Sequence, residues 1–478
     1  MGPGFDRVVM QILVVIAILV GVGCTRPNPN RCCVDEADCA ANGIALGSTC
    51  DDGRVCRGNI CIVQECATTA ECDLAAPYCI GAPAGSCQEG CSSDADCPGF
   101  GQTEALNYCL ESRCFQCRSN SDCGVAAPIC NSGTCSACER HDQCSTGACG
   151  ANGTCAVPSE IAYVTPGGST TSDCSQAAPC SLATALNMVE RIFVFVLPGT
   201  YMESATLVAR GRKWLIGQGA VRPVLMSGST GPIIGPSSAA ELTLDHLRIA
   251  GATTGALGER VAVSCGGASA GSSLTLIDTL VDSNLDAGVQ SRRCSLTVRR
   301  STFASNSGFG IEAVDSTVKV DRSLFQGNAT GLFFDFGKLE LTNSFFTRNQ
   351  NGLDLSVSQP ADTHAEFNTI VDNSGTGGFG LRCEGTAGMT FPNNLIARNS
   401  ANVVGDIECV GAGTGSILIG TDISSLKFRS PDTQPYDYHL LPGSGAIDAA
   451  NASTLDHDFD GEARPKGAGR DVGADEAE

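Results

Sequence analysis

Positive charge is scarce in this 478-residue sequence. Lys and Arg number 30 against 51 Asp and Glu, which gives a formal net charge of −21 at pH 7. An acidic chain repels phosphate-rich polymers and anionic surfaces. The charge balance therefore argues against nucleic acid or anionic lipid as the partner of the folded part.

Large apolar residues are scarce between residues 31 and 157, and this stretch holds one histidine, His141. A segment without a core needs covalent staples. It carries 22 of the 29 cysteines, and a Cys-x5-Cys spacing recurs five times among them. Zinc sites typically have a Cys-x2-Cys spacing instead. We therefore predict disulfides, which also place the chain outside the cytoplasm.

The cysteines form five tandem modules over residues 32–157. The last four modules carry four cysteines each and the first carries six. Four cysteines allow three connectivities, and the sequence leaves the choice open. The segment resembles the tandem cysteine-rich arrays of large bacterial surface proteins, which implies a stalk or a protein-contact region rather than an enzyme.

The N-terminus has a mainly apolar run, Val8–Gly23, that is short for a membrane span of about 20 residues. It resembles a bacterial lipoprotein signal over residues 1–23, with Cys24 as the lipid-bearing residue and residues 24–31 as a tether. This implies a lipid anchor in the outer membrane, at the cell surface. An uncleaved helix, an ordinary signal peptide and no processing remain as alternatives.

A six-residue pattern that ends in asparagine occurs six times after residue 278, at separations of 22, 22, 21, 24 and 26 residues. Alternating apolar pairs before the first four asparagines predict strands with one buried face. Three short strands per turn, glycine at the corners and a stacked interior describe a parallel β-helix over residues 160–430. We expect the asparagines to form a structural ladder that tolerates left-handed backbone, not a binding site. They are Asn284, Asn306, Asn328, Asn349, Asn373 and Asn399.

Three cysteine pairs accompany the repeats. Cys265 and Cys294 end strands in consecutive turns, as do Cys383 and Cys409, so each pair is predicted to stack and form a disulfide. Cys174 and Cys180 are predicted to pin the start of the helix. Every cysteine thus receives a structural role.

Ser181 is suited to cap a short helix that covers the open apolar end of the solenoid. The flanking segments Tyr163–Gly168 and Leu197–Tyr201, taken with this helix, resemble the pectate-lyase-like right-handed β-helix proteins, and the resemblance extends over about residues 160–475. It implies an all-β fold. The helix residues expected to face inward are Leu182, Ala185, Leu186 and Val189.

The C-terminal sequence resembles the ending of bacterial surface β-helix proteins of the choice-of-anchor Q kind, which implies that residues 431–478 close the last coil. Asp456, Asp458 and Asp460 mimic the start of a calcium loop, although its twelfth position is Gly467. A capping network with Arg464 is the alternative. We therefore expect no cofactor, with calcium as a candidate.

The resemblance reaches carbohydrate lyases and glycosidases, which need clustered carboxylates. In each repeat, the strand positions between the apolar residues are expected to point outward and to stack in columns from turn to turn. These columns instead predict stacked ion pairs, Arg299 with Asp321 and Lys319 with Glu340, and hold no acidic triplet. The Asp-Asp and Gly-His-Gly signatures of polygalacturonase-like enzymes are missing. The remaining catalytic candidates are His364, Glu366 and Glu340.

The sequence favours a lipid-anchored, non-catalytic surface protein that adheres to, or binds, extracellular polysaccharide or another surface protein. The alternative is a polysaccharide lyase or glycoside hydrolase that acts on an acidic polysaccharide.

Overall fold

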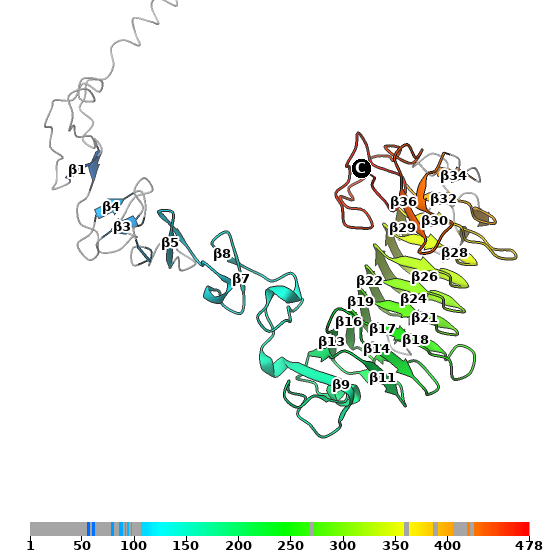
Figure 1. Ribbon diagram of the computed structural model, residues 1–478, viewed down its shortest axis with the longest axis horizontal. Helices are drawn as coiled ribbons and strands as arrows, with labels where there is room; N and C mark the ends of the chain where they lie inside the picture. Colours follow the sequence, from blue (N-terminus) through cyan, green and yellow to red (C-terminus); the bar gives the residue numbers. More distant parts are fainter. Residues whose placement is uncertain are drawn as a thin grey trace, which may run out of the picture. The chain divides into compact units, whose positions relative to one another are not determined.

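The protein is represented by a computed structural model. The structure describes residues 55–57, 60–62, 78–80, 86–88, 91, 93–94, 97, 107–266, 271–357, 363–385, 391–405, 418–420 and 425–477. The chain divides into two compact units, residues 1–156 and 157–478 (Figure 1). The predicted signal, Cys24 and the tether lie outside the described residues. None of the described helices is long and apolar enough to cross a membrane.

The described part of the first unit contains short antiparallel hairpins, each strand of which has a cysteine at its centre, and the 3-10 helices Asn120–Asp122 and His141–Gln143. In every hairpin the two cysteines lie directly opposite one another, for example Cys109 and Cys114. The hairpins are β1 (Val55–Arg57) with β2 (Ile60–Ile62), β3 (Tyr78–Ile80) with β4 (Ser86–Gln88), β5 (Tyr108–Leu110) with β6 (Arg113–Phe115), and β7 (Ile129–Asn131) with β8 (Thr134–Ser136).

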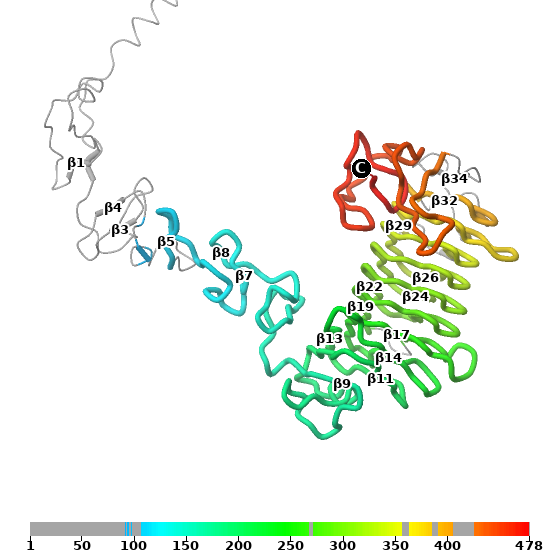
Figure 2. Tube along the Cα trace, viewed as in Figure 1, coloured from blue at the N-terminus to red at the C-terminus, as the bar shows by residue number. Residues whose placement is uncertain are grey.

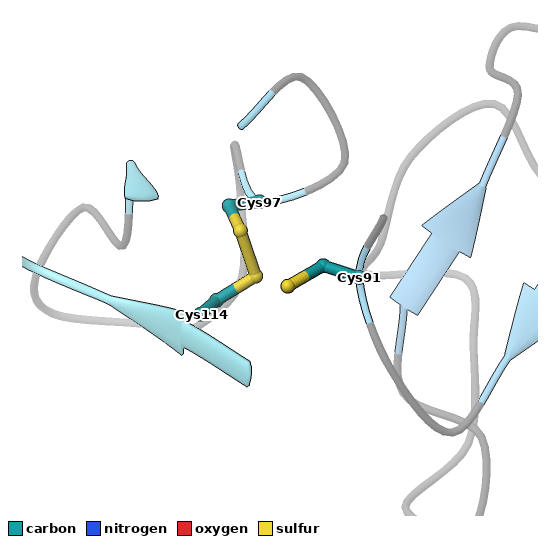
Figure 3. A group of neighbouring side chains, drawn as sticks. All are labelled: Cys91, Cys97 and Cys114. Carbon is teal, nitrogen blue, oxygen red and sulfur yellow. A yellow bond between two sulfur atoms is a disulfide. The ribbon is translucent and has the colours of Figure 1, made fainter. Parts of the chain in front are cut away.

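One disulfide connectivity is common to the last three modules: the first cysteine pairs with the third, and the second with the fourth. Figure 3 shows Cys97 bonded to Cys114, with Cys91 beside them. Because all twelve cysteine sulfurs of these three modules are in disulfides, the modules offer no thiolate to a metal ion. The pairs are Cys91–Cys109, Cys97–Cys114, Cys117–Cys130, Cys123–Cys135, Cys138–Cys149 and Cys144–Cys155.

A repeated hydrogen bond fixes each of these modules. Three residues after the first cysteine, a side chain accepts the backbone N–H of the third cysteine: Asp94 at 2.9 Å, Asn120 at 2.9 Å and His141 at 3.0 Å. The histidine of this unit therefore replaces a carboxylate or an amide as a structural acceptor.

The second unit is a parallel β-helix in which each coil contributes strands to three faces, and successive coils stack as Figure 1 shows. The first face comprises β9 (Ile161–Ser169), β10 (Phe193–Val196), β13 (Arg212–Gly217), β16 (Glu241–Asp245), β19 (Ser273–Ile277), β22 (Ser295–Arg299), the C-terminal parts of β24 (Phe309–Asp321) and β26 (Thr330–Thr342), and β29 (Thr363–Glu366).

The second face comprises β11 (Thr200–Glu203), β14 (Val224–Ser227), β17 (Arg248–Ala250), β20 (Leu280–Asp282), β23 (Thr302–Ala304), β25 (Leu324–Gln326), β27 (Phe345–Thr347), β30 (Thr369–Val371), β32 (Leu395–Ala397) and β34 (Leu418–Gly420). The third comprises β12 (Leu207–Ala209), β15 (Ile234–Pro236), β18 (Val261–Gly266), β21 (Ala287–Arg292), the N-terminal parts of β24 and β26, β28 (Asn351–Val357), β31 (Leu381–Gly385) and β33 (Val403–Gly405).

The predicted repeat register is confirmed. Leu274, Leu296, Val318 and Leu339 pair in succession across the first face and are fully buried. On the second face, the Phe303, Phe325 and Phe346 rings stack with centroids 4.9 and 4.5 Å apart. Each coil thus buries its apolar residues against those of its neighbours.

The predicted asparagine ladder is also confirmed. Each Nδ2 donates to the Oδ1 of the asparagine in the next coil at 2.9 Å, from Asn284 to Asn399. The expectation that these asparagines adopt left-handed backbone is wrong, because the residue before each one does so. The left-handed residues are Ser283, Ser305, Gly327, Arg348, Asp372 and Arg398, with φ from 54° to 70°.

Glycine was expected at the corners, but its role here is different. A Cβ on Gly331 would lie 2.6 Å from the carbonyl oxygen of Gly352 and 2.8 Å from the Phe346 ring, and Gly288, Gly310 and Gly352 are equally crowded. These glycines are required by the close approach of neighbouring coils, while five of the six left-handed corners before the asparagines are residues with side chains.

The helix α3 (Leu182–Asn187) lies at the start of the second unit, and Ser181 caps it by accepting the Thr184 N–H at 3.2 Å. Leu182, Ala185 and Leu186 are buried as predicted. Val189 is not, since the helix ends at Asn187 and Val189 is 68% exposed. A disulfide joins Cys174 to Cys180, and another joins Cys265 to Cys294. Cys383 is disulfide-bonded, while Cys409 lies outside the described residues.

The C-terminal segment, in orange to red in Figure 2, contains β35 (Phe428–Ser430) and β36 (Asp437–Leu440). Its described apolar contacts are to the outer surface of the second face. The reason is that β27, β30 and β32 carry apolar side chains on their outer side as well, and the segment covers them. These residues are Phe345, Val371, Leu395 and Ala397. Whether the segment also closes the last coil stays a prediction, because most of that coil lies outside the described residues.

Candidate functional site

A groove of about 320 Å³ lies on the outer surface of the first face. Its lining includes Arg299 at the end of β22, Lys319 in β24, and the corner residues Arg300 and Arg322. His457 and Leu455 of the C-terminal segment also line it. The site therefore combines adjacent coils with a segment that is distant in sequence.

Left-handed backbone positions two of these cations. Arg300 and Arg322 occupy equivalent corners of consecutive coils, with φ of 48° and 50°. Arg322 also contacts Gly461, since a Cβ on that glycine would lie 2.7 Å from the Nη1 atom of Arg322. Four cationic side chains line the groove against two carboxylates, Asp321 and Glu340.

One of the two predicted ion pairs is present. Lys319 Nζ lies 2.7 Å from Glu340 Oε2. The predicted pair of Arg299 with Asp321 is wrong, because within the described residues Asp321 instead contacts Arg322 at 3.1 Å and His457 at 3.4 Å. The Arg299 guanidinium therefore remains outside any ion pair formed by the described residues, at the edge of the groove.

The catalytic candidates stack across the same face in the predicted register, Glu340 beside His364 and Thr342 beside Glu366. His364 Nε2 lies 3.1 Å from Glu366 Oε2. Glu366 was expected on a solvent-exposed face, but only 7% of the residue is exposed, and Asn393 Nδ2 donates to its Oε1 at 2.9 Å.

The protonation of this pair favours a structural role. The hydrogen bond to Glu366 raises the pKa of His364, and the charges of Glu366 and Glu340 add to that effect. Burial alone would raise the pKa of Glu366, but hydrogen bonds from His364, Ser453 and Asn393 outweigh it and hold the pKa below its usual value. A carboxylate held ionised in this way is a poor general acid.

The three aspartates of the predicted calcium loop do not converge. Asp456 is exposed and contacts His457, while Asp460 lies 2.9 Å from His439. Asp458 is fully buried, and its two oxygens accept the backbone N–H groups of Glu462 and Glu476. The alternative was a network of an aspartate with Arg464, but Arg464 forms its fully buried ion pair with Glu476, at 2.7 Å.

Sequence reasoning missed Arg300, Arg322 and His457 as groove residues. Basic residues do follow two successive strand ends, as Arg299-Arg300 and Asp321-Arg322, and this was the available signal. His457 had no comparable signal, because its position depends on how the C-terminal segment packs.

Comparisons with known proteins agree with the fold. Residues 261–423 match a family model described as "Right handed beta helix region", which assigns the predicted right-handed class to these coils. No curated protein matches the sequence significantly.

Two solved structures are similar at low identity. One is titled "Crystal structure of pectate lyase Pel9A", with 16% identity, 66% of this chain and 96% of that chain covered, and a TM-score of 0.42. The other is titled "Geobacillus virus E2 - ORF18", with 12% identity, 55% and 61% coverage, and a TM-score of 0.32. At these values the similarity carries no argument about activity.

Proposed function

We propose that the cationic groove on the first face binds an acidic polysaccharide outside the cell. The observation that carries this proposal is the concentration of Arg299, Arg300, Lys319 and Arg322 in one groove of a chain with net charge −21. Guanidinium groups bind carboxylate and sulfate oxygens through paired, charge-assisted hydrogen bonds. A polymer with regularly spaced anionic groups would meet cations presented by consecutive coils.

Binding without turnover is supported by the state of the catalytic candidates. Glu366 is hydrogen-bonded and buried, and Glu340 is paired with Lys319. Neither is a free carboxylic acid beside a second free carboxylate, which glycoside hydrolysis requires. Cleavage remains the alternative, and His457 is the groove side chain that would be suited to proton transfer.

We further propose that the protein is held at the outer membrane by a lipid on Cys24, with the cysteine-rich modules as a stalk between the anchor and the β-helix. The disulfides of these modules support an oxidising, extracytoplasmic location. The likeness of the C-terminal segment to choice-of-anchor Q surface proteins is in keeping with that location.

The proposal is tested by binding of the purified full-length protein to polyuronates, sulfated glycans and neutral glycans, with a depolymerisation assay on the same polymers. We expect acidic glycans alone to bind, with an affinity that falls as salt rises. The double variant Arg299→Glu, Lys319→Glu should bind at least 10-fold more weakly, since each lost charged hydrogen bond costs about 1.5–3 kcal/mol.

Arg212→Glu is the matched control, because Arg212 lies on the same face in β13 and outside the groove. Equal binding by the double variant and the parent protein would contradict the proposal. Shortening of the polymer that is lost in His457→Ala would favour the enzyme alternative.

A further inference from the structure

A second cavity, of about 480 Å³, lies within the C-terminal segment. His439 of β36, Asp460 and Asp475 line it, and one potential ligand atom from each lies within 4.8 Å of the others. These residues come from three separate stretches of the segment. The cavity is distinct from the cationic groove, whose lining residues it does not share.

The second imidazole nitrogen of His439 faces this cluster. Its Nε2 is enclosed and lies 2.9 Å from Asp460 Oδ2, in an ion-pair contact whose geometry is not that of a well-formed hydrogen bond. An enclosed nitrogen without a well-formed hydrogen bond is costly, and a cation bound between the two side chains would supply a bond there.

Only one of the two carboxylate oxygens of the buried Asp475 accepts a hydrogen bond from the described residues. Asp475 is 6% exposed, and its Oδ2 accepts the Leu440 N–H at 2.6 Å. Its other oxygen has no hydrogen bond within the described residues, and the residue lines the cavity. A carboxylate oxygen and an imidazole nitrogen are thus presented to the same space.

A further carboxylate orients the imidazole. Asp437 Oδ1 lies 2.5 Å from His439 Nδ1, so the ring donates its Nδ1–H to Asp437 and directs Nε2 toward Asp460 and the cavity. This is the arrangement by which carboxylates fix metal-binding histidines in proteins. Arg429 holds Asp437 in turn, at 3.3 Å.

We propose that His439, Asp460 and Asp475 bind a divalent transition-metal cation of the zinc class, with Asp437 as a positioning residue. One imidazole and two carboxylates suit such a cation better than calcium, which takes six to eight oxygen ligands. Three protein ligands leave the fourth position of a tetrahedral zinc ion open to the cavity. The cation would join β36 to two later stretches of the C-terminal segment.

The test is zinc binding by the purified full-length protein, treated with chelator and then kept without reductant so that the disulfides stay closed. Calorimetry with Zn²⁺ and with Ca²⁺, metal content after dialysis and the change in Tm are measured. We expect one Zn²⁺ per chain, a higher Tm with Zn²⁺, and at least 10-fold weaker binding of Ca²⁺.

His439→Ala and Asp475→Asn should lose zinc binding, and Asp437→Asn should weaken it about 10- to 100-fold. His246→Ala is the matched control, since His246 lies 2.6 Å from Asp278 as a surface pair outside the cavity. His439→Gln with a normal circular dichroism spectrum replaces His439→Ala if that variant does not fold. Undiminished zinc binding in the His439 and Asp475 variants, or no zinc binding by the parent protein, would overturn the proposal.

Discussion

Glu366 illustrates how neighbouring side chains determine the role of a single residue. The strand alternation places it correctly on the outward column of the first face. However, Ser453 of the C-terminal segment and Asn393 enclose it, so that the buried Glu366 forms a hydrogen-bonded pair with the half-exposed His364. A residue that the sequence offers as a catalytic candidate thus stabilises the contact between a coil and the segment that packs on it.

The pair of His364 and Glu366 makes the free energy of unfolding depend on pH. The pKa of His364 is raised and that of Glu366 is lowered. The pair therefore contributes to folding stability at pH values below the raised histidine pKa and above the lowered glutamate pKa. We expect His364→Ala to destabilise the protein by less than about 1 kcal/mol near pH 5.5, because the histidine is half-exposed. The difference should shrink as pH rises through the histidine pKa.

Urea unfolding of His364→Ala and the parent protein at pH 5.5 and pH 9 measures this effect. Thr297→Ala, in the same outward column, is the control that should show no pH dependence. An equal loss of stability for His364→Ala at both pH values would contradict the pairing.

At the scale of the element, each coil is fixed at its turns as well as in its core. Besides the asparagine ladder, a second ladder runs through the first residue of the repeated pattern, where each backbone N–H is accepted by the side chain of the next coil. Its members are Thr279, Ser301, Ser323, Ser344, Asn368 and Asn394. The pattern contains this column, but its role became clear only from the stacking of the coils.

Asn328→Ala tests what one rung contributes. Asn328 accepts from the Asn306 backbone N–H at 3.1 Å and donates to the Phe303 carbonyl at 3.0 Å, and both partners are buried. Alanine would remove both of these bonds and the side-chain bonds to Asn306 and Asn349, so we expect a loss of about 3 kcal/mol in the free energy of unfolding.

Denaturant unfolding of Asn328→Ala measures this loss. Asn187→Ala, an exposed asparagine of α3, is the control and should change stability by less than about 0.5 kcal/mol. If the two variants were equally stable, the ladder would contribute nothing beyond the packing of the core.

At the scale of the whole molecule, the chain uses two different solutions to the problem of stability. The described part of the first unit has disulfides in place of an apolar core, with two bridges in each of the last three modules. The second has a continuous apolar interior, to which cysteine pairs add local clamps. Each bridge is worth about 2–4 kcal/mol through restriction of the unfolded chain.

The proposed anchor makes a prediction for the whole chain. Cys24→Ser removes the only acceptor for the lipid in our proposal, so the protein should move from the membrane fraction to the soluble fraction of cells. Immunoblotting of fractionated cells measures this, with Thr25→Ala as the control that keeps the cysteine. A variant that stays in the membrane fraction would exclude the lipid.

The sequence by itself determined the repeat register, the asparagine ladder and the presence of disulfides, because these depend on spacing along the chain that parallel stacking preserves from coil to coil. Only the tertiary structure decided which cysteines pair within a module, where the C-terminal segment packs, and which side chains form the two cavities. Those contacts join residues such as Asp321 and His457, which are 136 positions apart. No period in the sequence relates such residues, so their meeting depends on the packing of one surface against another.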